Sequence, residues 1–389
     1  MAIFAHGATS TKVNSFDSGL ELAGEIRQAF GAERLAGIVA YSTVSHDQRA
    51  FLRGLREAAG TGVPVIGCSG QGVMGRGTVV EDGYAAGAMG LGGDSLHLGA
   101  SHVGDFHVDS AAKAKALGRA LREQAVGPLR TVVLHYDPLC GADLQVFLSA
   151  LHEEVRCPIV GGAAAEFWGP MQQTFQYVNQ EAFHRTAVAA GLSGTFTAEL
   201  DLCHGTSPVG IEMVVTKAEG NSVLEFDGRP ALDVWQEFCH EAPEHIDHSG
   251  AIGIGLPTGD PEVYLVRCAF GVDESRRAVL FQAGIPVGAR VMLNHRTIRG
   301  ALEGTAAMGQ RLAARLRGRK VRAVLGFECG ARTKPFLGKE MTLKENQDLQ
   351  ETLGPGPAWL GMLAWGEVAP FDGSPGFVNF SFPVLALAD

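Results

Sequence analysis

Residues that could bind or react with a small molecule recur where apolar segments of this sequence end. The set is Cys68, Ser69, Gly161, Gly162, His204, Cys329, Arg332, Trp365 and Glu367. Glycines at strand ends let a ligand approach backbone N–H groups closely. The guanidinium of Arg332 could hold a carboxylate or phosphate through two parallel hydrogen bonds, and Glu367 could hold an amine. These residue types predict a binding site for a small polar ligand, with no catalytic residue assigned.

Each of these residues also has a structural interpretation. Cys68 and Cys329 follow apolar residues, so they are either small buried side chains, ligand contacts or reactive thiols. Arg332 could form a salt bridge inside the protein, and Glu367 could be its partner. His204 is either a buried histidine with its hydrogen bonds satisfied or a ligand-binding residue. The residues alone leave these alternatives open.

The usual nucleotide-binding and hydrolase motifs do not occur. The sequence has no GxxxxGK[ST], no GxGxxG between a strand and a helix, no HExxH and no GxSxG. One tract, residues 240–248, has histidines at a metal-like spacing, but Pro243 favours a loop there and we predict no metal site. No reaction class follows from motifs, so enzymatic activity is left undecided.

A unit of secondary structure is predicted twice in the first half of the chain. Residues 37–102 contain a strand, a helix from Asp47 to Ala59 and further strands, and residues 130–204 repeat that order around a helix from Ala142 to Val155. A repeat of this length predicts a duplicated β-α-β-β-β unit with its Gly-rich strand ends at related positions. Helix crossovers require parallel neighbours and short hairpins require antiparallel ones, so the sheets are expected to be mixed.

The second half is expected to form another domain that reuses the same element order. Residues 323–329 match the opening strand of each repeat, residues 343–353 match the helix, and residues 358–367 match the second strand. The pattern of the sequence changes after His204, which favours a division near residue 215. We therefore predict an α/β protein (α+β with mixed sheets) of two domains, at residues 30–215 and 216–389.

Composition excludes several classes of function. Hydrophobic residues are 46% and charged residues 19% of the chain, which is typical of a folded globular protein. A net charge of −10 opposes nonspecific binding of nucleic acid. No apolar run reaches the about 18 residues needed to cross a bilayer, and the N-terminus lacks a signal pattern. Seven cysteines without a CxxC motif favour a reducing compartment, so we expect a cytoplasmic protein without nucleic-acid or membrane partners.

Short motifs in the right order resemble those of one known family. Gly67-Cys-Ser-Gly70, Gly161-Gly-Ala-Ala164 and His204-Gly205 are similar to the FIST N-terminal domain. Cys329-Gly-Ala-Arg332 and Trp365-Gly-Glu-Val-Ala-Pro370 are similar to the FIST C-terminal domain. The resemblance covers nearly the whole chain, from residue 30 to the end. It identifies the chain as a member of a family of bacterial signal-transduction proteins that sense small ligands.

The resemblance implies a cytoplasmic sensor that holds an amino-acid-like ligand between its two domains and signals to a separate partner. Some members resembling this chain are haem proteins that sense nitric oxide and regulate a histidine kinase, so haem is an open cofactor and His204 its candidate axial ligand. A third hypothesis is an enzyme that uses Cys329 or Cys68 as a nucleophile. We rank the small-ligand sensor first.

Overall fold

Four sheets and the helices packed on them make up the structure, a computed structural model that describes residues 3–239, 252–257, 264–371 and 373–389. The histidine-containing tract 240–248 lies outside these residues. Three of the four sheets mix parallel and antiparallel pairs, whereas the fourth pairs its strands antiparallel. The predicted α/β class with mixed sheets is confirmed.

One order of elements occurs three times in the part of the molecule that we call the body. The first unit comprises α1 (Ser15–Phe30), β2 (Leu35–Ser42), α2 (Gln48–Ala59), β3 (Val65–Ser69), β4 (Val73–Gly75), β5 (Thr78–Val80), β6 (Ala86–Gly93) and β7 (Leu96–Gly104). The second comprises α3 (Ser110–Gln124), β8 (Leu129–Tyr136), α4 (Leu144–Val155), β9 (Ile159–Ala163), β10 (Gln176–Val178), β11 (Glu181–Phe183), β12 (Thr186–Gly194) and β13 (Thr197–Cys203). The third comprises α6 (Ile298–Arg315), β21 (Val321–Cys329), a short π-helix (Thr333–Leu337), α7 (Lys339–Leu353), β22 (Ala358–Ala364), β23 (Glu367–Phe371), β24 (Ser374–Val378) and β25 (Phe382–Ala388). For the third unit, the N-terminal strand β1 (Ile3–Ser10) occupies the position that β7 and β13 occupy in the first two units.

The sheets join these three units in a ring. Their strand orders are β1-β6-β2-β3-β10-β11, β7-β12-β8-β9-β23-β24 and β13-β25-β21-β22-β4-β5. In each sheet, one unit supplies the central strands and another supplies the terminal hairpin, so no unit completes a sheet by itself. That residues 37–102 and 130–204 superpose as one duplicated unit stays a prediction, which backbone superposition tests.

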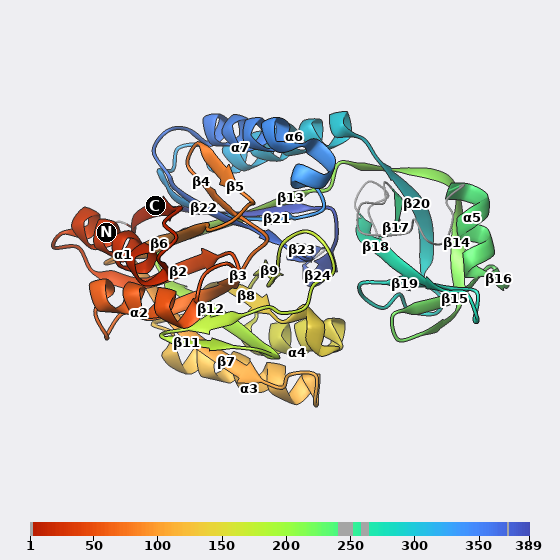
Figure 1. Cartoon of the computed structure of the whole chain (residues 1–389), viewed down its shortest axis with the longest axis horizontal. Coiled ribbons are helices and arrows are strands. Elements are labelled where there is room, and N and C mark those ends of the chain that lie inside the picture. The colour runs from red at the N-terminus through yellow and green to blue at the C-terminus, as the bar shows by residue number, and fades with distance from the viewer. Residues whose placement is uncertain (1–2, 240–251, 258–263, 372) are drawn as a thin grey trace.

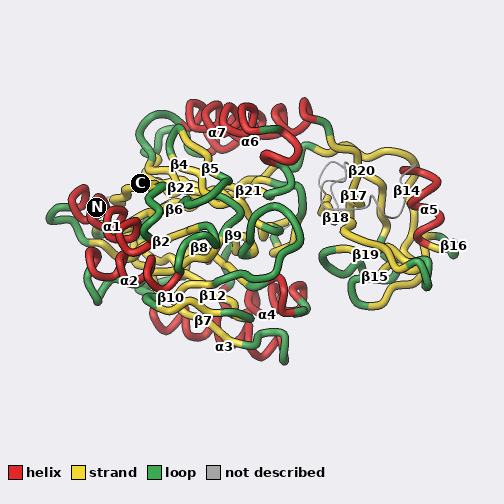
Figure 2. Tube along the Cα trace, viewed as in Figure 1, coloured by secondary structure: helices red, strands yellow, loops and turns green. Residues whose placement is uncertain are grey.

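A helix pair packs on the outer side of each sheet, and the three pairs lie at three corners of the body (Figure 1). Figure 2 shows the strands enclosed between these helices. In each sheet, successive side chains of a strand point to opposite faces, so its apolar residues are divided between two cores. In β2, Val39 and Tyr41 face the core at the centre of the body, whereas Ile38 and Ala40 face α1 and α2. The body therefore has one shared core and a smaller core under each helix pair.

Glycines allow α1 and α2 to approach closely. A Cβ on Gly19 would lie 2.1 Å from the carbonyl oxygen of Phe51, whereas a Cβ on Gly24 of the same helix would have nothing within 4 Å. We expect Gly19→Ala to destabilise the protein by about 1–3 kcal/mol because the helices must move apart. Gly24→Ala should instead stabilise it by about 0.5–1 kcal/mol through helix propensity. Urea unfolding of both variants measures this, and effects of the same sign would contradict the packing argument.

Residues 206–296 form a separate lobe, inserted between the second and third units (green to cyan in Figure 1). Its elements are β14 (Thr206–Glu219), β15 (Ser222–Phe226), β16 (Arg229–Pro230), α5 (Ala231–Cys239), β17 (Ile252–Pro257), β18 (Tyr264–Asp273), β19 (Ala278–Phe281) and β20 (Arg290–Arg296). The sheet closes on itself because β14 pairs with both β20 and β15. The lobe has its own core, which includes Trp235 and Phe281.

The sheets cross the predicted division between domains. Strand β14 runs through residue 215, and strands of the third unit pair with β4, β9 and β13 of the first two units. The division at residues 215 and 216 stays a prediction, which limited proteolysis can test. Within the part of the chain that the structure describes, no helix is both long and apolar enough to cross a membrane.

Candidate functional site

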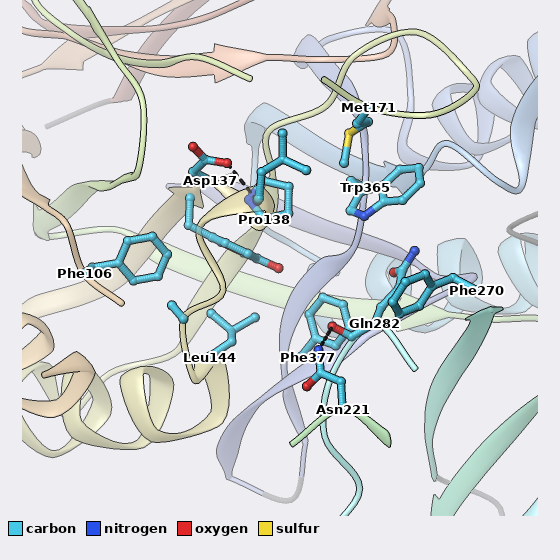
Figure 3. A pocket seen from close by; sticks show the side chains of 13 residues that line it. Phe106, Asp137, Pro138, Leu144, Met171, Asn221, Phe270, Gln282, Trp365 and Phe377 are labelled. Atoms are coloured by element: carbon cyan, nitrogen blue, oxygen red, sulfur yellow. Dashed lines mark hydrogen bonds between the residues drawn. The ribbon is translucent and has the colours of Figure 1, made fainter. Parts of the chain in front are cut away.

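A cavity of about 290 Å³ lies where the lobe meets the second and third units of the body. The body supplies Phe106, Tyr136, Asp137, Pro138, Leu139, Ala142, Leu144, Met171, Trp365 and Phe377, and the lobe supplies Asn221, Phe270 and Gln282. Figure 3 shows Phe106 and Leu144 on one side of this cavity and Phe270 and Trp365 on the other. Apolar and aromatic walls with a few polar groups are typical of small-molecule sites. We call this space the interlobe cavity.

The end of β8 and the turn after it build one wall of the interlobe cavity. Asp137 caps a 3-10 turn (Pro138–Cys140), and its Oδ1 accepts a hydrogen bond of 2.8 Å from the backbone N–H of Leu139. Pro138 suits the first position of such a turn because it has no N–H to satisfy. The next cap, Asp143, accepts from Val146 and starts α4. This wall is therefore held by local hydrogen bonds.

Tyr136 brings a buried hydroxyl to the same wall. Its side chain is 4% exposed, and its Oη has no hydrogen-bond partner among the described residues. Burial and the nearby Glu367 carboxyl raise the pKa of Tyr136 well above its usual value, so the hydroxyl keeps its proton. A buried hydroxyl without a partner is a position where a ligand could form a hydrogen bond.

A much smaller cavity, of about 10 Å³, adjoins the interlobe cavity and shares Trp365 and Gln282 with it. Cys329 and Trp168 also line it. Trp168 in turn lines an open cavity of about 650 Å³ with Gln71, Glu81, Asp82 and Lys334 among others. These three cavities follow one another on the side of the body where parallel strands end. Two of the predicted site residues, Trp365 and Cys329, therefore lie in this region.

Glu367 lies beside this region but is closed off from solvent. It stands opposite Gly162 in the pairing of β23 with β9, and it is fully buried. Its Oε2 accepts hydrogen bonds from the backbone N–H (3.2 Å) and the hydroxyl (2.7 Å) of Ser381. Burial raises the pKa of Glu367 to about 8, and the hydrogen bonds from Ser381 and Cys329 offset only part of that shift. The carboxyl thus carries its proton at neutral pH.

Gly162 and Cys68 occupy matching positions in the core at the centre of the body. Gly162 faces His135 across the β8–β9 pair, and Cys68 faces Tyr41 across the β2–β3 pair. The His135 Nδ1–H donates to the Gly162 carbonyl at 3.0 Å, so its Nε2 accepts from the Tyr41 hydroxyl at 3.2 Å. The Cys68 sulfur lies 3.5 Å from that of Met362. These residues hold the three sheets together.

Ser69 and Gly161 also make contacts within the body. The Ser69 hydroxyl donates to the carbonyl of Ala165 at 2.8 Å and accepts from the N–H of Phe175 at 3.1 Å. A Cβ on Gly161 would lie 1.9 Å from the carbonyl oxygen of Leu134, so this close approach requires glycine. The structure thus gives both residues a role in packing the strands.

Arg332 is enclosed by acceptors of the protein and is 1% exposed. Its guanidinium donates to Glu345 (2.6 Å), to Thr305 (3.2 Å) and to the His204 carbonyl (3.0 Å), and lies 3.4 Å from Glu328. Burial opposes its charge, but Glu345 and Glu328 hold the pKa of Arg332 above its usual value. Burial and Glu345 raise the pKa of Glu328 well above its usual range. The donors predicted to hold a ligand are therefore engaged inside the protein.

His204 lines a different cavity, of about 600 Å³, together with Arg311 and Arg315. Burial, together with Arg332, lowers the pKa of His204 to about 4, so the ring is neutral at pH 7. Its Nδ1 accepts from the backbone N–H of Thr206 at 3.1 Å, which places the ring proton on Nε2. A haem iron needs a nitrogen with a free lone pair. His204 in this arrangement does not fit an axial ligand.

The two cysteines considered as nucleophiles are held as thiols. Burial raises the pKa of both Cys68 and Cys329 well above the usual value. Cys68 packs in the core at the centre of the body, and the cavity beside Cys329 has a volume of only about 10 Å³.

Among the described residues, no group of three or more His, Cys, Asp or Glu side chains could hold a metal ion.

Most side chains around the interlobe cavity were missed from sequence. Tyr136 ends an apolar strand and Asp137 follows it, so the rule that found Cys329 could also have found them. Asn221, Phe270 and Gln282 belong to the inserted lobe, and no local pattern indicates that the lobe approaches β8. Of the nine predicted residues, Glu367 pairs with Gly162 and is hydrogen-bonded by Cys329, and Cys329 shares a cavity with Trp365. The side chain of Cys68 packs in the core at the centre of the body, and that of Arg332 forms a buried ion pair with Glu345.

Comparison with known proteins places the chain in a family. Residues 35–229 match the FIST N domain, and residues 231–370 match the FIST C domain. The uncharacterized protein Mb0898c of Mycobacterium bovis is 28% identical over 193 residues, which are 48% of this chain and 49% of that protein. The uncharacterized protein MJ1623 of Methanocaldococcus jannaschii is 36% identical over 97 residues, 25% of this chain and 19% of that protein.

The chain spans about half the length of the mycobacterial relatives that it matches. The structure of PurLQS from Thermotoga maritima aligns with 99% of this chain and 72% of its own, at 10% identity and a TM-score of 0.25. That score is too low to transfer any property to this protein. The two domain matches cover most of the chain, and the protein belongs to the FIST family, whose domains are sensors in signal transduction.

Proposed function

We propose that this protein is a small-ligand sensor that binds its ligand in the interlobe cavity. The observation that carries the proposal is that both parts of the molecule supply the walls. Tyr136 and Trp365 come from the body, whereas Phe270 and Gln282 come from the lobe. A ligand that contacts both parts favours one position of the lobe against the body, and so shifts a conformational equilibrium.

The connections of the lobe suit such a shift. The chain enters the lobe at residues 203–206 and leaves it at residues 296–298. Gly205, in the first connection, has a φ of +66°, and a Cβ there would lie 2.4 Å from the Cα of Ala301 in α6. Because Gly205 packs directly on α6, a change in its backbone conformation would move the lobe relative to the third unit. A separate protein would respond to that change in the position of the lobe. The family resemblance predicts a histidine kinase as one such partner.

The predicted amino-acid-like ligand needs a cation for its carboxylate. None of the described side chains that line the interlobe cavity is Lys, Arg or His. The expected partner, Arg332, is engaged by Glu345 elsewhere. The amino-acid-like ligand stays a prediction from sequence. We also propose that the protein acts in the cytoplasm, since every cysteine whose side chain the structure describes is a free thiol.

Filling the interlobe cavity should abolish ligand binding. Ala142 lines the cavity, so Ala142→Trp places an indole in it, whereas Val146 on α4 is 44% exposed and outside it. In a thermal-shift screen of a metabolite library, we expect at least one compound to raise the melting temperature of the wild type and of Val146→Trp. The same compound should leave Ala142→Trp unchanged. A shift that persists in Ala142→Trp, or a library without any stabilising compound, contradicts the proposal.

A further inference from the structure

The charges around the interlobe cavity restrict what it can hold. Asp137 is the one charged side chain among the described lining residues. Its Oδ1 accepts from Leu139 (2.8 Å) and from the Thr174 hydroxyl (2.9 Å), and its Oδ2 accepts from the N–H of Arg185 (2.7 Å). Burying an ion without an opposite charge is unfavourable. A ligand anion would meet no lining cation, and a ligand cation would meet a carboxylate that already has three donors.

One buried cation, Arg267, packs against the lining residue Phe377. It is 3% exposed, its Nη1 donates to the carbonyl of Phe377, and its guanidinium lies 5.3 Å from the centre of the Phe377 ring. Burial lowers the pKa of Arg267 to about 10, so it stays charged at neutral pH. It is not among the residues that line the cavity. Arg267 therefore contacts the wall through Phe377, and its charge also acts on the Tyr136 hydroxyl.

The wall of the cavity also carries a hydroxyl, amides and several aromatic rings. Tyr136 presents the hydroxyl that has no partner among the described residues. Gln282 accepts a hydrogen bond from the Asn379 amide through its Oε1, which orients the Gln282 amide. The rings of Phe106, Phe270, Trp365 and Phe377 surround these groups. Aromatic side chains favour flat ligands that can stack or pack edge-to-face against them.

We infer that the interlobe cavity selects an uncharged, flat ring compound that carries a hydrogen-bond acceptor for the Tyr136 hydroxyl. The inference rests on the proposed function, because it names the ligand class of the same cavity. The ring fills the space between the aromatic walls. The acceptor gives Tyr136 the partner that it lacks among the described residues, without placing a net charge beside Asp137.

Three probes of one shape and different charge test the inference. They are 2-naphthamide (uncharged), 2-naphthoate (anionic) and 2-naphthamidine (cationic), each titrated into the full-length protein by calorimetry at pH 7. We expect 2-naphthamide to bind at least about tenfold more tightly than the other two. Tyr136→Phe should weaken its binding about tenfold through loss of one hydrogen bond. Tyr84→Phe, a tyrosine outside the cavity, is the matched control and should bind like the wild type.

Each different result of these titrations would overturn a specific part of the inference. Tighter binding of 2-naphthoate would overturn the uncharged class and assign anion recognition to Arg267, and tighter binding of 2-naphthamidine would overturn it in favour of Asp137. Unchanged affinity of Tyr136→Phe would remove Tyr136 from recognition. If none of the probes binds while a library compound still distinguishes Ala142→Trp from Val146→Trp, the ligand class is wrong and the sensor cavity stands. Loss of that contrast would overturn the proposed function itself.

Discussion

Arg332→Ala is expected to lower the free energy of unfolding by about 3–5 kcal/mol. The substitution removes the cation that lies 2.6 Å from the Glu345 carboxylate, and both side chains are 1% exposed. An uncompensated carboxylate would then remain in the interior. Arg332→Lys should recover only part of the loss, because one ammonium cannot reproduce the contacts to Glu345, Thr305 and the His204 carbonyl together.

An exposed ion pair on α7, the helix that carries Glu345, provides the control. Lys344 and Asp348 of α7 form an ion pair whose side chains are 68% and 52% exposed, so Lys344→Ala should cost only about 0–1 kcal/mol. Replacing both buried partners, with Arg332→Met and Glu345→Leu, should restore most of the stability. Urea unfolding without ligand measures all of these variants. If Arg332→Ala costs no more than Lys344→Ala, the buried pair does not stabilise the fold, and Arg332 becomes a ligand-binding candidate again.

Stability should also fall as pH rises from 4.5 to about 8, through the titration of Glu367. The pKa of Glu367 is raised from 4.5 to about 8 in the folded protein. Between these two values the unfolded chain has released the proton and the folded protein still holds it, so stability falls as pH rises. The shift corresponds to about 4–5 kcal/mol over that range. Glu367→Gln has no proton to lose at this position and should lose this part of the decline, whereas Glu328, whose pKa is also raised, keeps its own contribution.

His135 should produce the opposite slope between pH 4 and 6.5, a range that overlaps the lower part of the Glu367 range. Burial lowers the pKa of His135 from 6.5 to about 4, against the hydrogen bond to Gly162. Between pH 6.5 and 4 the unfolded chain binds a proton that the folded protein excludes, so stability falls as pH falls. The contribution of His135 is about 3 kcal/mol. His46 and His204, whose pKa values are also lowered to about 4, add to this limb, which should remain in Glu367→Gln and serves as the internal control. Parallel profiles of wild type and Glu367→Gln from pH 5 to 8 would refute the buried neutral carboxyl.

The helices, the strands and their order along the chain could be predicted from the sequence, because caps, turn residues and apolar spacing act between residues close in the chain. Apolar spacing and an N-capping aspartate start α2 after Asp47, and Gly31 ends α1, so these helices could be predicted within a few residues. The element order of the first two units is equally visible, since each strand and helix has its own periodicity. The rule that polar residues follow apolar strands placed Trp365 and Cys329 near cavities for the same reason.

Strand partners depended on the tertiary structure. The pairing of β1 with β6, and of each hairpin with another unit's sheet, joins residues far apart in the chain. Such pairs depend on which apolar faces are buried together, and periodicity within one strand does not contain that information. The ring of three sheets was therefore decided by long-range burial.

The roles of individual polar residues were decided in the same way. Sequence shows that Arg332 can hold a carboxylate, and the fold determines that the carboxylate is Glu345 of the following helix. It likewise leaves the Tyr136 hydroxyl without a partner among the described residues and brings Phe270 and Gln282 of the lobe to the same cavity. Residue type sets which bonds a side chain can form. Burial and distance, which only the folded chain defines, determine which of them it forms.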